Sequence, residues 1–223
     1  MKQFILHILL LTSLSVATQN LPNGFVYLKD IAPSIKSDVR YCSHNNFIGT
    51  PIDGYENNIV ITTLPTAKAL QKVQKKLLSK GLSLKIFDAY RPQRAVNHFV
   101  AWAKVLKDTV MKQQYYPKIH KKHLFKLGYI ASKSGHTRGS TVDLTIVNLK
   151  TGKELDMGSP YDFFGPISHV FSKQLTPKQH ANRFLLRKRM LEENFKPYKN
   201  EWWHFTLRNE PFPKTYFNFP VKL

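Results

Sequence analysis

A tight turn followed at once by a strand pattern is the feature of this sequence that most constrains its fold. Residues 134–143 read Ser-Gly-His-Thr-Arg-Gly-Ser-Thr-Val-Asp, and Leu-Thr-Ile-Val follows them. Glycines let the backbone turn tightly, and the alternating β-branched residues from Thr141 to Val147 predict a strand. His136 is therefore expected on a loop that enters a strand, and Asp143 within that strand. Because a buried carboxylate must be paired with another polar group or bind a metal, we expect Asp143 to do one or the other.

A second histidine segment lies far along the chain, at residues 201–205, which read Glu-Trp-Trp-His-Phe. His136, Asp143 and His204 offer the nitrogen and oxygen ligands that zinc prefers, with a fourth position open for water. Zinc lowers the pKa of such a water to about 7, and Glu201 would accept its proton as a general base. Taken alone, His136 could be an ordinary hydrogen-bonded histidine and the tryptophans core residues. The two segments together favour a metal site.

The spacing of Glu201 and His204 makes a structural demand. Residues three apart point to opposite faces of an ideal strand. Both side chains can reach one site only if Glu201 lies at an irregular strand start or beside a bulge. The alternative is a surface glutamate in a salt bridge.

These segments resemble a known peptidase family. Ser-x-His-x-x-Gly-x-x-x-Asp with a distant Glu-x-x-His is similar to the zinc D,D-peptidases of the Hedgehog/D-Ala metallopeptidase superfamily. Residues 38–41, 88–96 and 157–164 narrow the resemblance to the D-alanyl-D-alanine dipeptidases, known best from vancomycin-resistance clusters. The similarity runs in order from about Phe25 to Phe219. It implies one α+β domain, with a small, mainly antiparallel sheet surrounded by helices, that binds one Zn²⁺.

The resemblance places the arginine that stabilises the transition state at Arg91. This residue precedes Pro92, which fixes the turn, and its guanidinium could stabilise negative charge on the amide oxygen. It could instead anchor the loop through carboxylates, and Arg94 and Arg138 are alternatives from the residues alone. The sequence departs from the family pattern at Gly135, where a second serine is usual; this change barely affects the chemistry.

Four further residues are candidates for binding the two charged ends of a free dipeptide. By resemblance, Asp162 would bind the ammonium group, with Tyr41 nearby. Ser134 and Tyr55 are candidates for the carboxylate. The structural alternative is that the tyrosines belong to the core and that Asp162 caps a turn.

The implied activity is hydrolysis of the free dipeptide D-Ala-D-Ala, in cell-wall turnover or D-Ala salvage. One alternative is an exported zinc D,D-carboxypeptidase or endopeptidase that acts on peptidoglycan. Another is a binding protein with structural zinc. Glu201 argues against this last alternative, because a structural site needs no base and usually fills all four metal positions.

The N-terminal segment predicts export. Residues 1–17 begin with Lys2, continue through a short apolar run and end Ser-Val-Ala, the pattern of a secretory signal cleaved after Ala17. The run is too short for a comfortable permanent anchor in a bilayer. We therefore expect residues 18–223 to form the dipeptidase domain in the periplasm or medium. An exported enzyme cannot deplete a cytoplasmic D-Ala-D-Ala pool, so glycopeptide resistance is not expected.

The net charge of +20 favours solubility and anionic partners. Its basic residues are dispersed and no nucleic-acid-binding motif accompanies them, so we expect solvated helix faces and attraction to envelope polyanions. Cys42 is the only cysteine, which excludes an intramolecular disulfide and favours a packed small side chain.

Hydrophobic spacing and end signals predict three helices. They cover Thr63 to Lys80, Pro92 to about Gln114, and Thr176 to about Asn194. In the third helix, Thr176 is the expected N-cap and Pro177 the first helical residue.

Overall fold

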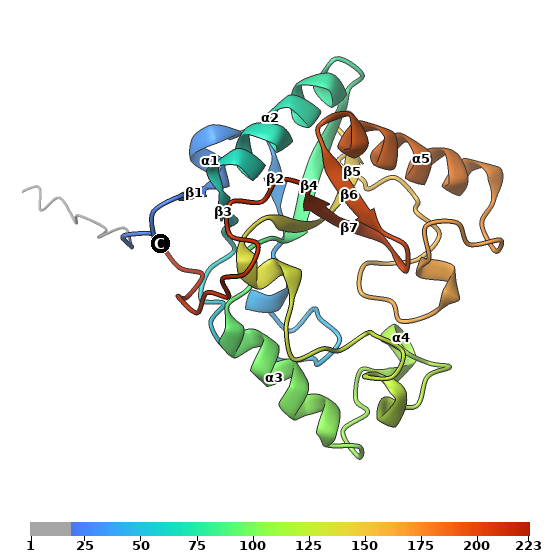
Figure 1. Cartoon of the computed structure of the whole chain (residues 1–223). Helices are drawn as coiled ribbons and strands as arrows, with labels where there is room; N and C mark the ends of the chain where they lie inside the picture. The colour runs from blue at the N-terminus through green and yellow to red at the C-terminus, as the bar shows by residue number, and fades with distance from the viewer. Residues whose placement is uncertain (1–18) are drawn as a thin grey trace, which may run out of the picture.

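A five-stranded sheet forms the centre of the molecule. The computed structural model describes residues 19–223, so the predicted signal at residues 1–17 lies outside the described part. The strand order is β2-β4-β5-β7-β6 (Figure 1). The strands are β2 Lys36–Ser37, β4 Leu82–Asp88, β5 Thr141–Asn148, β6 Phe195–Tyr198 and β7 Glu201–Leu207. Neighbouring strands are antiparallel except β2 and β4, which run parallel.

The remaining strands and the helices surround this sheet. A second, antiparallel pair joins β1 and β3. Helices α2 and α5 contact each other and pack against the sheet, above it in Figure 1, whereas α3 and α4 lie below it. This arrangement confirms the expected α+β domain with a small, mainly antiparallel sheet. The bounds are β1 Phe25–Tyr27, α1 Leu28–Ile31, η1 Arg40–Cys42, β3 Ile61–Thr63, α2 Leu64–Leu78, α3 Gln93–Lys104, α4 Lys112–Tyr115, η2 Lys121–His123, η3 Gly135–Arg138, η4 Pro166–Ser168 and α5 Pro177–Glu192.

Two of the three predicted helices agree closely with the structure. Helix α2 buries Ala67, Leu70, Val73 and Leu77, residues at helical spacing that face the core. Helix α5 begins after Thr176 with a capping box, in which the side chains of Thr176 and Gln179 each accept a hydrogen bond from the other residue's backbone N–H.

The second predicted helix is too long. Helix α3 begins at Gln93 and ends at Lys104, well before the expected end near Gln114. Just beyond it, the Lys121 ammonium donates hydrogen bonds to the carbonyl oxygens of Val105 at 2.9 Å and Asp108 at 2.8 Å. The Val105 carbonyl also accepts from the Asp108 backbone N–H at 3.1 Å, so a turn and a distant side chain satisfy these carbonyls in place of further helix.

The sheet register aligns three polar side chains in one row. Asp88 of β4 pairs with Asp143 of β5, and Asp143 pairs with His204 of β7. Directly paired residues on neighbouring strands place their Cβ atoms about 4.5–5.5 Å apart on the same face. Because Asp88 and Asp143 are both buried, this row needs compensating positive charge.

Gly139 fixes the loop that enters β5. Its φ of +82° lies in the left-handed region, and a Cβ there would collide with the Phe25 ring. Its carbonyl accepts a hydrogen bond from the Thr63 backbone N–H at 2.9 Å. Glycine is therefore required where η3 meets the β1–β3 pair, and this junction sets the direction of His136.

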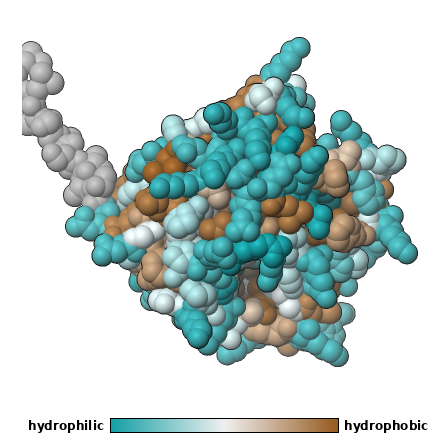
Figure 2. Space-filling view, turned by 45° about the horizontal axis from the view of Figure 1, so that its top comes forward, coloured by the Kyte–Doolittle hydropathy of each residue, from teal (hydrophilic) through white to brown (hydrophobic). Residues whose placement is uncertain are grey.

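The surface and the single cysteine match the expectations from composition. Figure 2 shows a mostly hydrophilic face with smaller hydrophobic areas between the polar side chains. Cys42 is half-buried against the core, with Sγ 3.0 Å from the Val39 carbonyl oxygen. No helix within residues 19–223 is long and apolar enough to cross a membrane.

Candidate metal centre and active site

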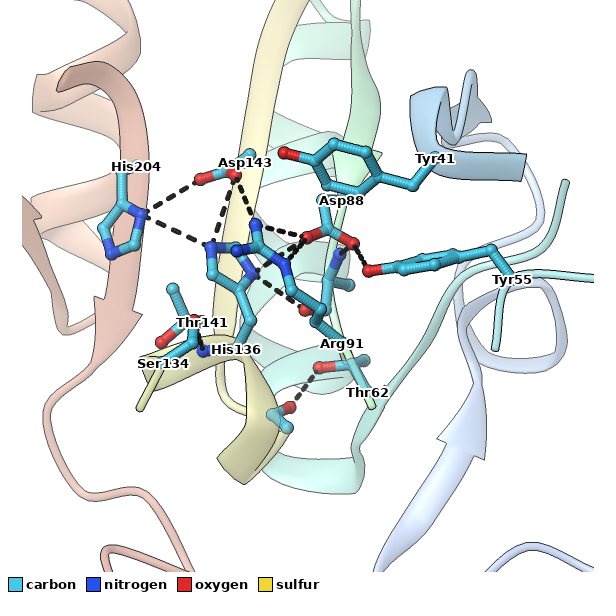
Figure 3. A network of polar contacts seen from close by, with 12 residues as sticks. Tyr41, Tyr55, Thr62, Asp88, Arg91, Ser134, His136, Thr141, Asp143 and His204 are labelled. Carbon is cyan, nitrogen blue, oxygen red and sulfur yellow. Dashed lines mark hydrogen bonds and ion pairs between the residues drawn. The ribbon is translucent and has the colours of Figure 1, made fainter. Parts of the chain in front are cut away.

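Three side chains from distant parts of the chain meet at one point (Figure 3). His136 comes from η3, Asp143 from β5 and His204 from β7. His136 Nε2 lies 3.4 Å from His204 Nδ1 and 3.3 Å from Asp143 Oδ2. His204 Nδ1 lies 3.1 Å from Asp143 Oδ1. The three residues predicted as metal ligands therefore form one cluster of possible ligand atoms.

The spacing of these atoms fits a tetrahedral metal. With bonds of about 2.0–2.1 Å, two ligand atoms at a tetrahedral angle are about 3.3–3.4 Å apart. The 3.4 Å between His136 Nε2 and His204 Nδ1 agrees with this value. Each of these nitrogens also lies close to a different oxygen of the Asp143 carboxylate, at 3.3 and 3.1 Å. Asp143 Oδ1 is also buried with no hydrogen-bond partner among the described residues. This unpartnered carboxylate oxygen lies 3.1 Å from the His204 Nδ1 atom, an arrangement well suited to a bound cation.

Neighbouring groups orient the ligands. His136 Nδ1 lies 2.8 Å from the Ala89 carbonyl oxygen. A carbonyl oxygen can only accept a hydrogen bond, so Nδ1 must be the donor. This contact places the proton of a neutral imidazole on Nδ1 and leaves Nε2 with its lone pair toward the cluster. The hydroxyl of Tyr161 donates to Asp143 Oδ2 at 3.1 Å. Both possible ligands are thus held by hydrogen bonds from neighbouring groups.

The charges of the cluster depend on one another. Burial alone would raise the pKa of Asp143, but His136 and His204 hold it well below its usual range. Burial would lower the pKa of His204, whereas the Asp143 carboxylate beside it raises this pKa overall. Asp143 is therefore ionised, as a metal ligand must be.

Glu201 reaches the cluster because its strand starts irregularly. It is the first residue of β7, and the register between β6 and β7 shifts between Pro197 and Tyr198. Its Oε2 lies 3.4 Å from His204 Nδ1, so both side chains point to the same side despite their spacing. Burial raises the pKa of Glu201 to about 7. A carboxyl group with such a pKa can both accept and return a proton near neutral pH.

Arg91 is held at the site by a carboxylate that we did not single out from sequence. Its Nε and Nη2 donate to Asp88 Oδ2 at 2.9 and 2.8 Å, and Nη2 lies 3.8 Å from Asp143 Oδ2. The two alternative arginines are engaged elsewhere: Arg138 forms a bidentate pair with Glu210, and Arg94 contacts Asn218. Of the three arginines, Arg91 is the one that lines the cavity described next.

A cavity of about 340 Å³ opens beside the cluster. Its wall contains the three possible ligands with Glu201 and Arg91, and also Tyr41, Ser134 and Asp162. Aromatic side chains complete the wall, among them Phe47, Phe99 and Phe164. The cavity is thus bordered by the cluster of possible metal ligands and by several charged and polar groups that could hold a small polar ligand.

Asp162 is the buried carboxylate of this cavity that lies away from the cluster. Tyr41 donates its hydroxyl proton to Asp162 Oδ2 at 2.8 Å. Burial raises the pKa of Asp162 well above its usual range, and the charge of Asp143 adds to the rise. A cationic ligand would favour the ionised form of such a carboxylate.

The two residues predicted for the substrate carboxylate lie in different places. Ser134 lines the cavity and its Oγ accepts from the His136 backbone N–H at 3.3 Å. Tyr55 lies outside the cavity wall formed by the described residues. Its hydroxyl donates to Asp88 Oδ1 at 2.6 Å (Figure 3). Tyr55 therefore supports the carboxylate that holds Arg91.

Asp88 and Tyr161 are the site residues that sequence reasoning missed. Asp88 is fully buried and lies 3.5 Å from His136 Nδ1, so it contacts a possible ligand as well as Arg91. An aspartate at the end of a buried strand, three residues before an arginine, was the available signal. Tyr161 had no comparable signal, because a tyrosine in an aromatic segment is usually a core residue.

The unusual Gly135 is explained by a close neighbour. A Cβ at this position would lie 2.7 Å from the Thr141 hydroxyl oxygen, closer than real side chains approach. A serine here would need Thr141 to move, so the smaller residue suits this loop.

Comparisons with known proteins agree with the motifs. The family model described as D-Ala-D-Ala dipeptidase matches residues 22–222. The chain is 43% identical over 199 residues to a D-alanyl-D-alanine dipeptidase of Enterococcus faecalis, and 41% identical over 199 residues to one of Enterococcus faecium. Each match covers 89% of this chain and 98% of the relative. A D-alanyl-D-alanine dipeptidase of Streptomyces coelicolor is 40% identical, covering 88% of this chain and 98% of that relative. The resemblance found in the motifs is thereby confirmed, and the chain belongs to the D-Ala-D-Ala dipeptidase family.

Proposed function

We propose that this chain is a zinc metallopeptidase that hydrolyses the free dipeptide D-Ala-D-Ala. The observation that carries the proposal is the cluster of His136, Asp143 and His204, whose imidazole nitrogens lie 3.4 Å apart, with Glu201 3.4 Å from one of them. The dipeptidase relatives support the choice of substrate. Three protein ligands with an adjacent carboxyl group are typical of catalytic rather than structural zinc.

The residues divide the chemistry among them. When bound, zinc supplies Lewis acidity and makes hydroxide available near neutral pH. Glu201 takes a proton from the attacking water and returns it to the leaving amine. Arg91 stabilises the negative charge that develops on the amide oxygen, and Asp88 holds its guanidinium in place.

The cavity favours a ligand with charged ends. Asp162, oriented by Tyr41, pairs with the ammonium group of the dipeptide. Ser134 donates its hydroxyl proton to the carboxylate end; its position in the cavity wall, next to the loop that carries His136, supports this role. A dipeptide has both ends free, whereas a peptidoglycan stem has its terminal D-Ala-D-Ala acylated.

A substrate panel tests the proposal. We expect the purified protein to cleave D-Ala-D-Ala but neither L-Ala-L-Ala nor a muropeptide, since Asp162 pairs with a free ammonium group and the relatives are D-alanyl-D-alanine dipeptidases. A chelator should abolish the cleavage and added Zn²⁺ should restore it, with free D-Ala measured as the product. Cleavage that survives complete removal of the metal would contradict the metallopeptidase proposal. Preference for the muropeptide would instead favour the exported carboxypeptidase or endopeptidase.

Export and a role in wall turnover or D-Ala salvage are part of the proposal. The basic, apolar and small-residue pattern at residues 1–17 supports them. We expect the mature protein from its native host to begin at Thr18 and to be found in the periplasm or medium. N-terminal sequencing of that protein checks this, and an intact Met1 or Lys2 on the fractionated protein would contradict it.

A further inference from the structure

A continuous series of polar contacts joins the cluster of possible metal ligands to Asp162 in the cavity wall. The Tyr161 hydroxyl lies 3.1 Å from Asp143 Oδ2 and 3.1 Å from the Tyr41 hydroxyl. The Tyr41 hydroxyl in turn lies 2.8 Å from Asp162 Oδ2. Two tyrosines thus connect a possible metal ligand to the carboxylate that faces the cationic end of a dipeptide.

Both tyrosine rings are fixed by packing. Tyr161 is 4% exposed and stacks on Phe87 with ring centroids 4.6 Å apart, while Trp203 meets it edge-on at 5.5 Å. Tyr41 is 1% exposed and contacts the ring of Phe99. Because the rings cannot move away without opening the core, the hydroxyls can respond mainly by changing the direction of their protons.

The number of protons makes the contacts depend on one another. When Asp143 and Asp162 are both ionised, as a cation at Asp162 favours, the three contacts that join the four groups share only the two hydroxyl protons. When Tyr41 donates to Asp162 and Tyr161 donates to Asp143, no proton remains for a hydrogen bond between the two hydroxyls. When Tyr161 donates to Tyr41, Asp143 loses that hydrogen bond. What binds at Asp162 therefore affects the hydrogen bond that reaches Asp143.

We propose that Tyr161 is a positioning residue that couples the Asp162 end of the cavity, through Tyr41, to the metal ligand Asp143. A dipeptide ammonium group at Asp162 keeps this carboxylate as the acceptor for Tyr41, which leaves the Tyr161 proton for Asp143. The free N-terminus of the substrate would then help to orient a metal ligand as well as contribute to binding. This inference rests on the proposed function for the identity of the ammonium group, but not for the coupling itself.

Metal affinity measured without substrate tests the coupling. The zinc dissociation constant is determined by chelator competition for the unmodified protein, Tyr161→Phe, Asp162→Asn and the double variant. Asparagine suits position 162 because the backbone there has a φ of 59°, which asparagine tolerates. The matched control is Tyr116→Phe, which removes a buried hydroxyl that has no partner within the described residues.

We expect Tyr161→Phe to weaken zinc binding by about tenfold or more, as loss of an outer hydrogen bond to a ligand does, and Tyr116→Phe to leave it unchanged. We also expect the effect of Asp162→Asn on zinc affinity to differ by about threefold or more between the protein that retains Tyr161 and the Tyr161→Phe variant. Simple loss of the Asp162 charge acts in both backgrounds and cancels in this comparison. Equal effects in the two backgrounds would overturn the proposal, as would unchanged zinc affinity in Tyr161→Phe.

Two further measurements keep the outcome decisive. Should Tyr161→Phe fail to fold, Tyr41→Phe removes the other hydroxyl of the series. The effect of Asp162→Asn on zinc affinity is then compared with and without Tyr41→Phe. With D-Ala-D-Ala as substrate, Tyr161→Phe should lower kcat by about tenfold with KM little changed, the expected sign of disturbed orientation rather than lost binding. If no variant or unmodified protein cleaves D-Ala-D-Ala, the proposed function fails while the zinc comparison still decides the coupling.

Discussion

His204→Ala is expected to lose zinc and peptidase activity together. The cluster would keep only His136 and Asp143, and two ligands hold zinc far more weakly than three. The metal would also no longer connect β7 with β5 and η3, so the thermal unfolding midpoint of the zinc-loaded protein should fall. Metal analysis after gel filtration, turnover of D-Ala-D-Ala and thermal unfolding measure the three effects.

His98→Ala is the matched control. His98 lies outside the cluster, and its Nδ1 is 3.2 Å from Asp53 Oδ1. It should keep stoichiometric zinc and normal turnover. Full zinc occupancy in His204→Ala would exclude His204 as a ligand and contradict the proposed metal centre.

Glu201→Gln is expected to separate chemistry from metal binding. The glutamine keeps the shape of the side chain but cannot accept a proton, and general acid–base groups typically contribute about 10²–10⁴-fold to rate. We therefore expect kcat on D-Ala-D-Ala to fall by about that factor, with zinc content and fold retained. Steady-state kinetics with metal analysis of the same preparation makes the measurement.

Glu193→Gln serves as its control. Glu193 does not line the cavity, and its Oε1 is 2.6 Å from the Lys76 ammonium nitrogen. This variant should turn over normally. Turnover near the normal rate in Glu201→Gln would remove Glu201 from the mechanism, and loss of zinc in that variant would assign it a ligand role instead.

The sequence was most informative where neighbouring residues decide the structure. The turn before Asp143 and the strand after it depend on local residues, and the spacing of Glu201 and His204 required an irregular strand start. The structure has such a start, where the register between β6 and β7 shifts. The capping box of α5 is equally local, because Thr176 and Gln179 contact each other across one turn.

What the sequence could not predict depends on contacts between distant segments. Asp88 acquires its place from the register of β4 against β5, and Tyr161 from a loop that folds back onto β5. Helix α3 ends at Lys104, and the distant Lys121 ammonium donates to the carbonyl oxygens of Val105 and Asp108 just beyond it. Tyr55 illustrates the same limit: its hydroxyl contacts Asp88 rather than the cavity. No spacing along the chain encodes these pairings.

The preference for a free N-terminus tests the account most directly. Acetylation removes the positive charge of the dipeptide and leaves the buried Asp162 without its cationic partner, a loss of about 1–3 kcal/mol or more. It also adds atoms beside Tyr41, which lines the cavity and contacts Asp162. The decisive measurement compares kcat/KM for D-Ala-D-Ala and N-acetyl-D-Ala-D-Ala on the zinc-loaded protein, with Asp162→Asn beside it. We predict at least about a tenfold preference for the free dipeptide, narrowed in Asp162→Asn. Comparable kcat/KM values for the two substrates in the unmodified protein would contradict the account, and a D,D-carboxypeptidase using the same metal ligands would replace it.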